Sequence, residues 1–142
     1  MRKAKLKKNL AIVALVAAVV ACSAPWLKRH GESVQCGNDM VSICFAAQQW
    51  AFEHDGHFPS NFAFLSQFSP DILICPGDST HKAAKDWASF TPTKNSSYEI
   101  VNPDLRIDNP DGVYLRCKIH GHVGYANIEV FDGMRRRLKT MW

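Results

Sequence analysis

The sequence lacks the short motifs that mark the common catalytic sites. It contains no Gly-x-Ser-x-Gly, no Cys-x-x-Cys, no His-Glu-x-x-His and no glycine-rich loop of the kind that cradles a phosphate. It also has no internal repeat, and its 142 residues are too few for a TIM barrel or a two-domain enzyme. With 46% hydrophobic and 21% charged residues, the composition is not that of a disordered chain. We therefore expect one globular domain and no enzyme.

Basic residues are scarce over most of the chain, although the formal net charge is +4. Of the 17 Lys and Arg residues, five lie within the first eight positions and four within the last eight. Residues 9–134 hold the other eight, together with all 13 acidic residues, so the body of the protein is acidic. Nucleic-acid binding needs a basic surface that contacts phosphates. We therefore expect no nucleic-acid partner and interpret the tail, residues 134–142, as solvated.

The N-terminal segment has the features of a membrane signal. Twelve apolar residues, 10–21, follow the five cations without interruption. Such a run suits the apolar core of a signal peptide, and its extension to residue 27 gives about 27 Å of helix, just enough to span the bilayer core. The preceding cations direct the rest of the chain outward. Residues 1–30 are thus predicted to be a membrane anchor or signal segment, and residues 31–142 an exported, periplasmic head.

Three fates of this segment remain open. It can stay as an uncleaved single-pass anchor in the cytoplasmic membrane. It can instead be removed before Cys22, because Val19-Val20-Ala21-Cys22 loosely matches a lipobox, and Cys22 would then carry the lipid. The third fate is cleavage and full secretion. All three place the head outside the cytoplasm, where disulfides form.

The other four cysteines are an even number, as in disulfide-bonded exported domains. Cys36 and Cys44 are eight residues apart in one predicted helix, about 12 Å of rise, so they cannot bond to each other. We expect a disulfide between Cys75 and Cys117, which leaves Cys36 and Cys44 as thiols. The alternatives are that Cys75 and Cys117 are free buried thiols, or that they bind zinc together with His120 and His122.

A loop rich in oxygen donors spans residues 102–112. It contains Asp104, Asp108 and Asp111 together with two asparagines. Hard cations such as Ca²⁺ bind carboxylate oxygens, so the three aspartates are candidate calcium ligands. Their spacing is not that of an EF-hand, and Asp and Asn also serve turn chemistry. Our first expectation is no cofactor, with calcium here and zinc at the cysteines as alternatives.

Hydrophobic periodicity predicts an α+β fold. Apolar residues recur every three or four positions from Cys36 to about His54, which predicts an amphipathic helix that ends at Asp55-Gly56. This helix should continue the N-terminal membrane helix and pack on a small antiparallel sheet of about four strands. The remaining predicted elements are a short helical segment over 62–68, strands over 71–75, 97–101, 113–119 and 126–130, a loop over 79–95 and a hairpin turn over 120–124.

Five short motifs occur in order along residues 36–133: Cys36-Gly-Asn38, Gly56-His-Phe-Pro59, Cys75-Pro-Gly-Asp78, Ser97-Tyr98, and His122 followed after nine residues by Asp132-Gly133. In this order they resemble the G-type pseudopilins of type II secretion systems and related type IV pilin-like proteins of the His-x9-Asp-Gly type. Gly124 and Asn127 also stand where such proteins often have them. The Gly-Phe-Thr-Leu-x-Glu processing site of pilins is missing before the apolar run.

The resemblance implies a non-enzymatic, membrane-anchored structural protein with no catalytic residues. Its partners would be the membrane and other proteins, either secretion-system or pilin-like subunits or copies of the same chain. G-type pseudopilins use a C-terminal calcium loop, and the resemblance assigns that part to residues 102–112. The alternative function is a periplasmic lipoprotein that binds a metal, either through this loop or through Cys75, Cys117, His120 and His122.

Overall fold

The computed structural model describes residues 2–131, without the side chains of residues 2–12, 14–16 and 18. The chain divides into two compact units, Met1–Gly31 and Glu32–Trp142. Helix α1, Arg2–Phe52, contributes to both. Within the described residues, no helix combines the length and the apolar character needed to cross a membrane. The Asp132-Gly133 pair and the basic tail, 134–142, lie outside the described residues.

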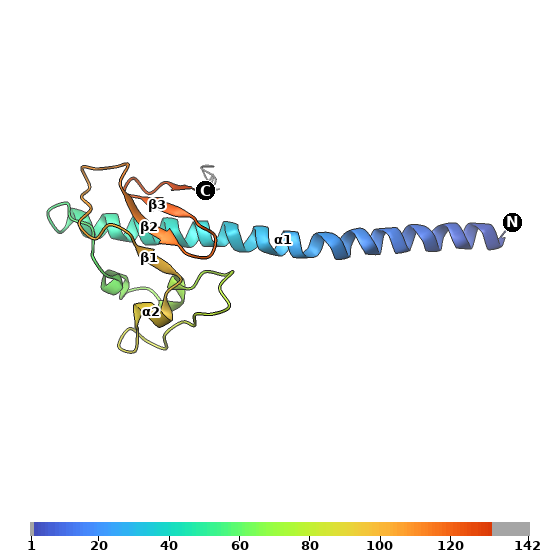
Figure 1. Cartoon of the computed structure of the whole chain (residues 1–142), viewed down its shortest axis with the longest axis horizontal. Helices are drawn as coiled ribbons and strands as arrows, with labels where there is room; N and C mark the ends of the chain where they lie inside the picture. The colour runs from blue at the N-terminus through green and yellow to red at the C-terminus, as the bar shows by residue number, and fades with distance from the viewer. Residues whose placement is uncertain (1, 132–142) are drawn as a thin grey trace. The chain divides into compact units, whose positions relative to one another are not determined.

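The second unit contains the C-terminal part of α1 and a four-stranded sheet. The strands are β1 (Tyr98–Ile100), β2 (Val113–Cys117), β3 (Val123–Tyr125) and β4 (Val130–Phe131). They pair antiparallel in the order β1-β2-β3-β4 (Figure 1). Three short helices lie before the sheet in sequence: η1 (Phe62–Leu65), η2 (Pro70–Leu73) and α2 (Pro92–Asn95). The expected α+β class, with a long helix and a four-stranded antiparallel sheet, is confirmed.

Helix α1 ends close to the predicted position. Asp55 and Gly56 both adopt left-handed backbone conformations, with φ of 54° and 79°. The N–H of Gly56 donates to the carbonyl of Ala51 at 2.9 Å, which satisfies one of the free carbonyls of the last turn. Glycine adopts this conformation at little cost, so the Asp-Gly pair stops the helix as its sequence predicts.

Helix α1 supplies eight of the twenty buried residues of the hydrophobic core in the described part of the chain. The helix lies across strands β1, β2 and β3 in the second unit (Figure 1). Tyr114 and Leu115 of β2 are fully buried on the sheet side. The fully buried helix residues recur at the spacing of one helix face, as the sequence predicts: Cys36, Met40, Ile43, Cys44, Ala47 and Ala51.

Gly124 of β3 permits the close approach of α1 to the sheet. A Cβ atom at this position would lie 2.6 Å from Sγ of Cys44 and 3.5 Å from Cε of Met40. We expect Gly124→Ala to lower the free energy of unfolding by about 1–3 kcal/mol, because the buried helix must shift to admit the methyl group. Denaturant unfolding measures the change. Gly31→Ala is the control, since nothing lies within 4 Å of its added Cβ; equal stability of both variants would contradict this packing.

The predicted strand over 71–75 is wrong. Residues 70–73 form the 3-10 helix η2, and the N–H of Ile72 donates to the carbonyl of Ser69 at 3.2 Å. The N–H of Cys75 donates to a side chain, Oγ of Ser97, at 2.9 Å rather than to a neighbouring strand. A short apolar run does not distinguish a strand from a buried helical turn, and Pro70 at the start favours the helix.

The end of the sheet also differs from the prediction. Val123 and Gly124, predicted as turn, form β3 together with Tyr125, and residues 126–129, predicted as strand, form the turn. In that turn Ile128 has a φ of 69°, and its N–H donates to the carbonyl of Tyr125 at 3.0 Å. Gly124 suggested a turn in the sequence, but the position is a glycine because Cys44 packs against it. The chain reverses before β3 in the turn that includes Gly121, which has a φ of 69°.

Candidate metal centre

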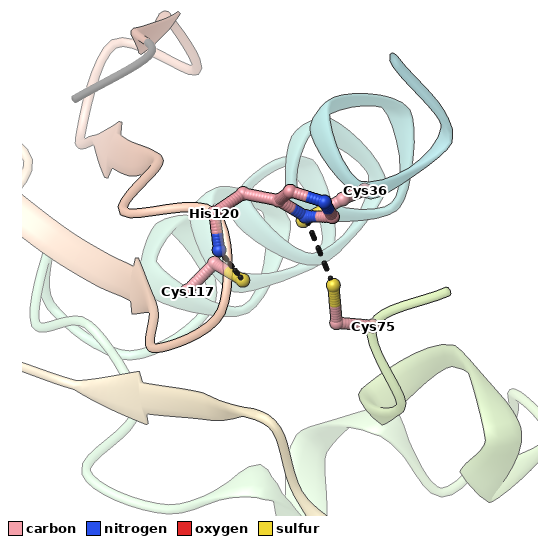
Figure 2. A group of neighbouring side chains, drawn as sticks. All are labelled: Cys36, Cys75, Cys117 and His120. Atoms are coloured by element: carbon pink, nitrogen blue, oxygen red, sulfur yellow. Dashed lines mark hydrogen bonds between the residues drawn. The ribbon is translucent and has the colours of Figure 1, made fainter. Parts of the chain in front are cut away.

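Four potential metal ligands converge beside the sheet: Cys36, Cys75, Cys117 and His120, here called the Cys3His cluster. Their ligand atoms all lie within 4.8 Å of one another. Figure 2 shows the side chains reaching toward one another from a helix, a loop and the end of a strand. The three cysteines are fully buried and His120 is half-buried. Elsewhere in the described part of the chain, His, Cys, Asp and Glu side chains form no comparable group of three or more.

Each ligand is placed by a different local structure. Cys36 lies on the buried face of α1, one turn before Met40. Cys75 follows η2 in an extended segment. Cys117 is the last residue of β2, and His120 lies in the turn that follows. Tertiary packing of helix, loop and sheet therefore brings the cluster together.

The turn after β2 directs two ligands to the same side. The N–H of Gly121 donates to the carbonyl of Cys117 at 3.1 Å, and the N–H of Cys117 donates to the carbonyl of His122 at 2.9 Å. Within this turn, the N–H of His120 also donates to Sγ of Cys117 at 3.4 Å. Hydrogen bonds from backbone N–H groups favour the charged form of a thiol. The turn thus prepares Cys117 as a thiolate beside His120.

The thiols of the cluster share protons unequally. A hydrogen bond from the Cys36 thiol, helped by the backbone N–H groups of His120 and Ile119, lowers the pKa of Cys117 despite its burial. Donation of that proton raises the pKa of Cys36. Burial raises the pKa of the Cys75 thiol to about 11. The fold therefore favours the thiolate form at Cys117 and the thiol form at Cys36 and Cys75, and a bound cation would displace the remaining protons.

A buried carboxylate stands next to the Cys75 loop. The side chain of Asp78 is fully buried and lies 2.7 Å from Nδ1 of His81. Burial by itself would raise the pKa of Asp78, but hydrogen bonds from Ser97, Thr80 and His81 outweigh it and hold the pKa well below the usual range. Asp78 is therefore an ionised acceptor at neutral pH.

Gly77 makes room for the imidazole of His120. A Cβ atom on Gly77 would lie 2.9 Å from Cε1 and 3.0 Å from Nε2 of His120, while Nδ1, the other neighbour of Cε1, is 3.1 Å from Sγ of Cys75. We expect Gly77→Ala to weaken metal binding about 10-fold or more, because the ring must leave its position beside Cys75. Competition with a chromophoric chelator measures the affinity; an unchanged affinity would show that the ring position is unimportant.

The structure does not support the predicted Cys75–Cys117 disulfide, since all five cysteines are described and all are free. The sequence predicted that Cys36 and Cys44 would both be thiols without a role in a disulfide or a metal site. Cys36 instead shares a hydrogen bond with Cys117, and Cys75 contacts His120. Of Cys36 and Cys44, only Cys44 lies outside the cluster, and burial raises the pKa of its thiol to about 12.

The zinc site considered from the sequence contains three of the four clustered residues. Cys75, Cys117 and His120 belong to the Cys3His cluster, but His122 does not. His122 is buried, its ring stacks on that of His120 at 5.4 Å between centroids, and its Nε2 lies 3.1 Å from Oγ of Ser33. Cys36 takes the fourth place. The helical spacing of Cys36 from Met40 and Ile43 could have revealed this ligand, because it places the three residues on the same face of the helix, toward the sheet.

The aspartates proposed as calcium ligands do not come together in the described part of the chain. Asp104, Asp108 and Asp111 are all exposed and form no group of candidate ligands. Asp108 pairs with Nε of Arg106 at 3.5 Å instead. The proposed lipidation residue, Cys22, is exposed on α1.

Comparisons of this chain with protein-family models, with curated proteins and with solved structures find no match. Its function must therefore be inferred from its own residues and their geometry.

Proposed function

We propose that the second unit is a non-catalytic, zinc-binding structural module, in which one Zn²⁺ joins α1, the loop after η2 and the end of β2. The observation that carries this proposal is the convergence of three buried cysteines and one histidine, with all ligand atoms within 4.8 Å of one another. Three thiolates and an imidazole are a ligand set of structural zinc sites. Thiolates also favour zinc over calcium and magnesium, which bind oxygen.

The spacing of the ligand atoms suits a tetrahedral ion. With Zn–S bonds of about 2.3 Å, sulfur atoms around tetrahedral zinc lie about 3.8 Å apart. No two ligand atoms of the cluster are more than 4.8 Å apart, so a small side-chain movement reaches the bound geometry. The direct contact between Nδ1 of His120 and Sγ of Cys75, at 3.1 Å, would be replaced by two bonds to the metal.

A site with four protein ligands is closed. Catalytic zinc sites keep one position for water or substrate, whereas structural sites fill all four with side chains. Three of the four ligands here are fully buried, which further excludes substrate from the metal. The zinc would therefore stabilise the fold rather than carry out a reaction.

Metal analysis of the purified full-length chain tests this proposal. We expect one zinc per chain, and we expect Co²⁺ to replace it with the visible absorption of a tetrahedral ion and a sulfur-to-cobalt charge-transfer band. Cys44→Ala should bind equally, since Cys44 is buried but outside the cluster. No bound zinc and no cobalt spectrum, or a peptide map with Cys75 joined to Cys117 in the native protein, would overturn the proposal.

A second candidate, compatible with the first, is the pilin-like structural protein that the motif order resembles. The favouring observation is the single 51-residue helix α1, whose C-terminal part packs on a small antiparallel sheet. Such a protein would act through protein–protein contact. Crosslinking in the native cell, followed by mass spectrometry, should join α1 to another copy or to secretion-system subunits. Intact mass of the same material would separate an uncleaved chain from one lipidated at Cys22, and recovery of uncrosslinked monomer alone would count against this candidate.

A further inference from the structure

We infer that Asp78, Ser97 and Tyr98 are positioning residues. Their hydrogen bonds orient two zinc ligands, Cys75 and Cys36. The inference rests on the zinc-binding function proposed above. Asp78, at the end of the motif Cys75-Pro-Gly-Asp78, and the pair Ser97-Tyr98, at the start of β1, are not among the four metal ligands. The inference gives these three motif residues a physical role.

Ser97 holds the backbone of Cys75. Its side chain is fully buried, and its Oγ accepts the N–H of Cys75 at 2.9 Å while donating to Oδ2 of Asp78 at 2.7 Å. A hydroxyl has one proton to give, so donation to Asp78 leaves the lone pairs of Oγ for Cys75. The N–H of Ser97 also donates to the carbonyl of Leu73 at 2.9 Å, which fixes Ser97 against the same loop.

Asp78 determines the direction of that chain of hydrogen bonds. Its backbone N–H donates to the carbonyl of Cys75 at 2.8 Å and closes the turn. Its Oδ1 accepts from Oγ1 and N–H of Thr80, both at 2.7 Å, and from N–H of His81 at 3.1 Å. A carboxylate with so many donors can only accept, so the Ser97 proton must point to it. Asp78 therefore keeps the Ser97 hydroxyl turned to receive the Cys75 N–H.

Tyr98 holds the sulfur of Cys36. Its ring is buried, and its hydroxyl donates to Sγ of Cys36 at 3.6 Å. Tyr98 also pairs with Cys117 across β1 and β2, and the N–H of Lys118 donates to the carbonyl of Ser97 at 3.2 Å. Two adjacent residues, Ser97 and Tyr98, thus touch the segments that carry all three cysteines. Hydrogen bonds behind metal ligands orient them and stabilise their charged form.

Zinc affinity and the cobalt spectrum of full-length variants test the inference. We expect Ser97→Ala, Asp78→Asn and Tyr98→Phe each to weaken zinc binding about 10- to 100-fold, the usual cost of losing such a partner. Tyr98→Phe should also shift the sulfur-to-cobalt charge-transfer band, because a thiolate loses a hydrogen-bond donor. A residue that only stabilises the fold would leave that band in place.

Matched controls separate positioning from stability. Metal binding is coupled to folding, so any loss of stability lowers the apparent affinity. Cys44→Ala removes a buried thiol outside the cluster, and Tyr114→Phe removes a buried hydroxyl that donates to the carbonyl of Pro59 at 3.0 Å. Neither group belongs to the cluster or to the three positioning residues. Both controls should lose thermal stability with only about a twofold change in zinc affinity and no shift of the charge-transfer band.

The possible results distinguish this inference from the proposed function. If the unaltered protein binds neither zinc nor cobalt, the zinc function fails and the inference fails with it. If the unaltered protein binds both, but Ser97→Ala and Tyr98→Phe lose no more affinity than their controls and leave the cobalt bands unchanged, the inference is wrong and the zinc function stands. Larger losses than the controls, with the shifted band for Tyr98→Phe, support it.

Discussion

Cys117→Ser should reduce zinc binding by about 100- to 1,000-fold. Structural zinc sites bind with about 10–16 kcal/mol of free energy, so one ligand of four is worth about 2.5–4 kcal/mol. Cys117 is also the cysteine whose pKa the fold lowers, through hydrogen bonds from Cys36 and from the backbone of the following turn. Its loss removes the ligand whose thiolate form the fold most favours. Zinc content after gel filtration and competition with a chelator measure the effect.

Two further substitutions decide which fourth ligand completes the site. Cys36→Ser should reduce zinc binding as strongly as Cys117→Ser, because Cys36 belongs to the cluster. His122→Ala should retain one zinc per chain, because His122 lies outside it. If His122→Ala loses zinc and Cys36→Ser retains it, the fourth ligand is His122, as the sequence suggested. Equal zinc content in all of these variants would show that the metal is bound elsewhere.

Removal of zinc should lower the melting temperature of the second unit by about 15–30 °C. A ligand present at 1,000 times its dissociation constant stabilises the folded state by about 4 kcal/mol, and 1 kcal/mol corresponds to about 4–8 °C for a domain of this size. The strands here have only two to five residues, so few backbone hydrogen bonds hold the sheet together. Circular dichroism with and without a chelator, in reducing buffer, measures the shift, and added zinc should reverse it.

The same melting experiment has an internal control. The Cys36→Ser variant should melt at one temperature with or without chelator, because its site no longer holds the metal. Cys44→Ala should respond to chelator like the unaltered protein, although its melting temperature is lower because a buried side chain is truncated. A chelator that leaves the unaltered protein unchanged would contradict a stabilising role for zinc.

Much of the fold was predictable from local patterns. The spacing of Met40, Ile43 and Ala47 marks one face of a helix, and Asp55-Gly56 marks its end, because both signals depend only on neighbours in sequence. Strand β2 was recognisable from the alternation that begins at Val113. Residues 71–75 and 126–129 were assigned wrongly, because short apolar runs and single glycines have several structural meanings.

Only part of the metal centre could be predicted from sequence patterns. Cys75, Cys117 and His120 were recognisable as possible ligands by residue type and by the Cys-x2-His spacing of the last two. The choice of Cys36 over His122 depends on how α1 lies against the sheet, and on a turn that directs His120 toward Cys75 while His122 contacts Ser33. Sequence spacing carries no information about such distances between separate elements.

Composition and periodicity therefore determined the acidic body of this protein, its α+β class and the helix that begins its core, since charge counts and residue spacing are properties of the chain itself. Only the tertiary structure decided that Cys36, Cys75 and Cys117 meet as free thiols beside His120, and that Asp78, Ser97 and Tyr98 stand behind them. The physical reason is packing: Gly124 and Gly77 have no side chains, and the space they leave allows the helix and the imidazole to reach these positions.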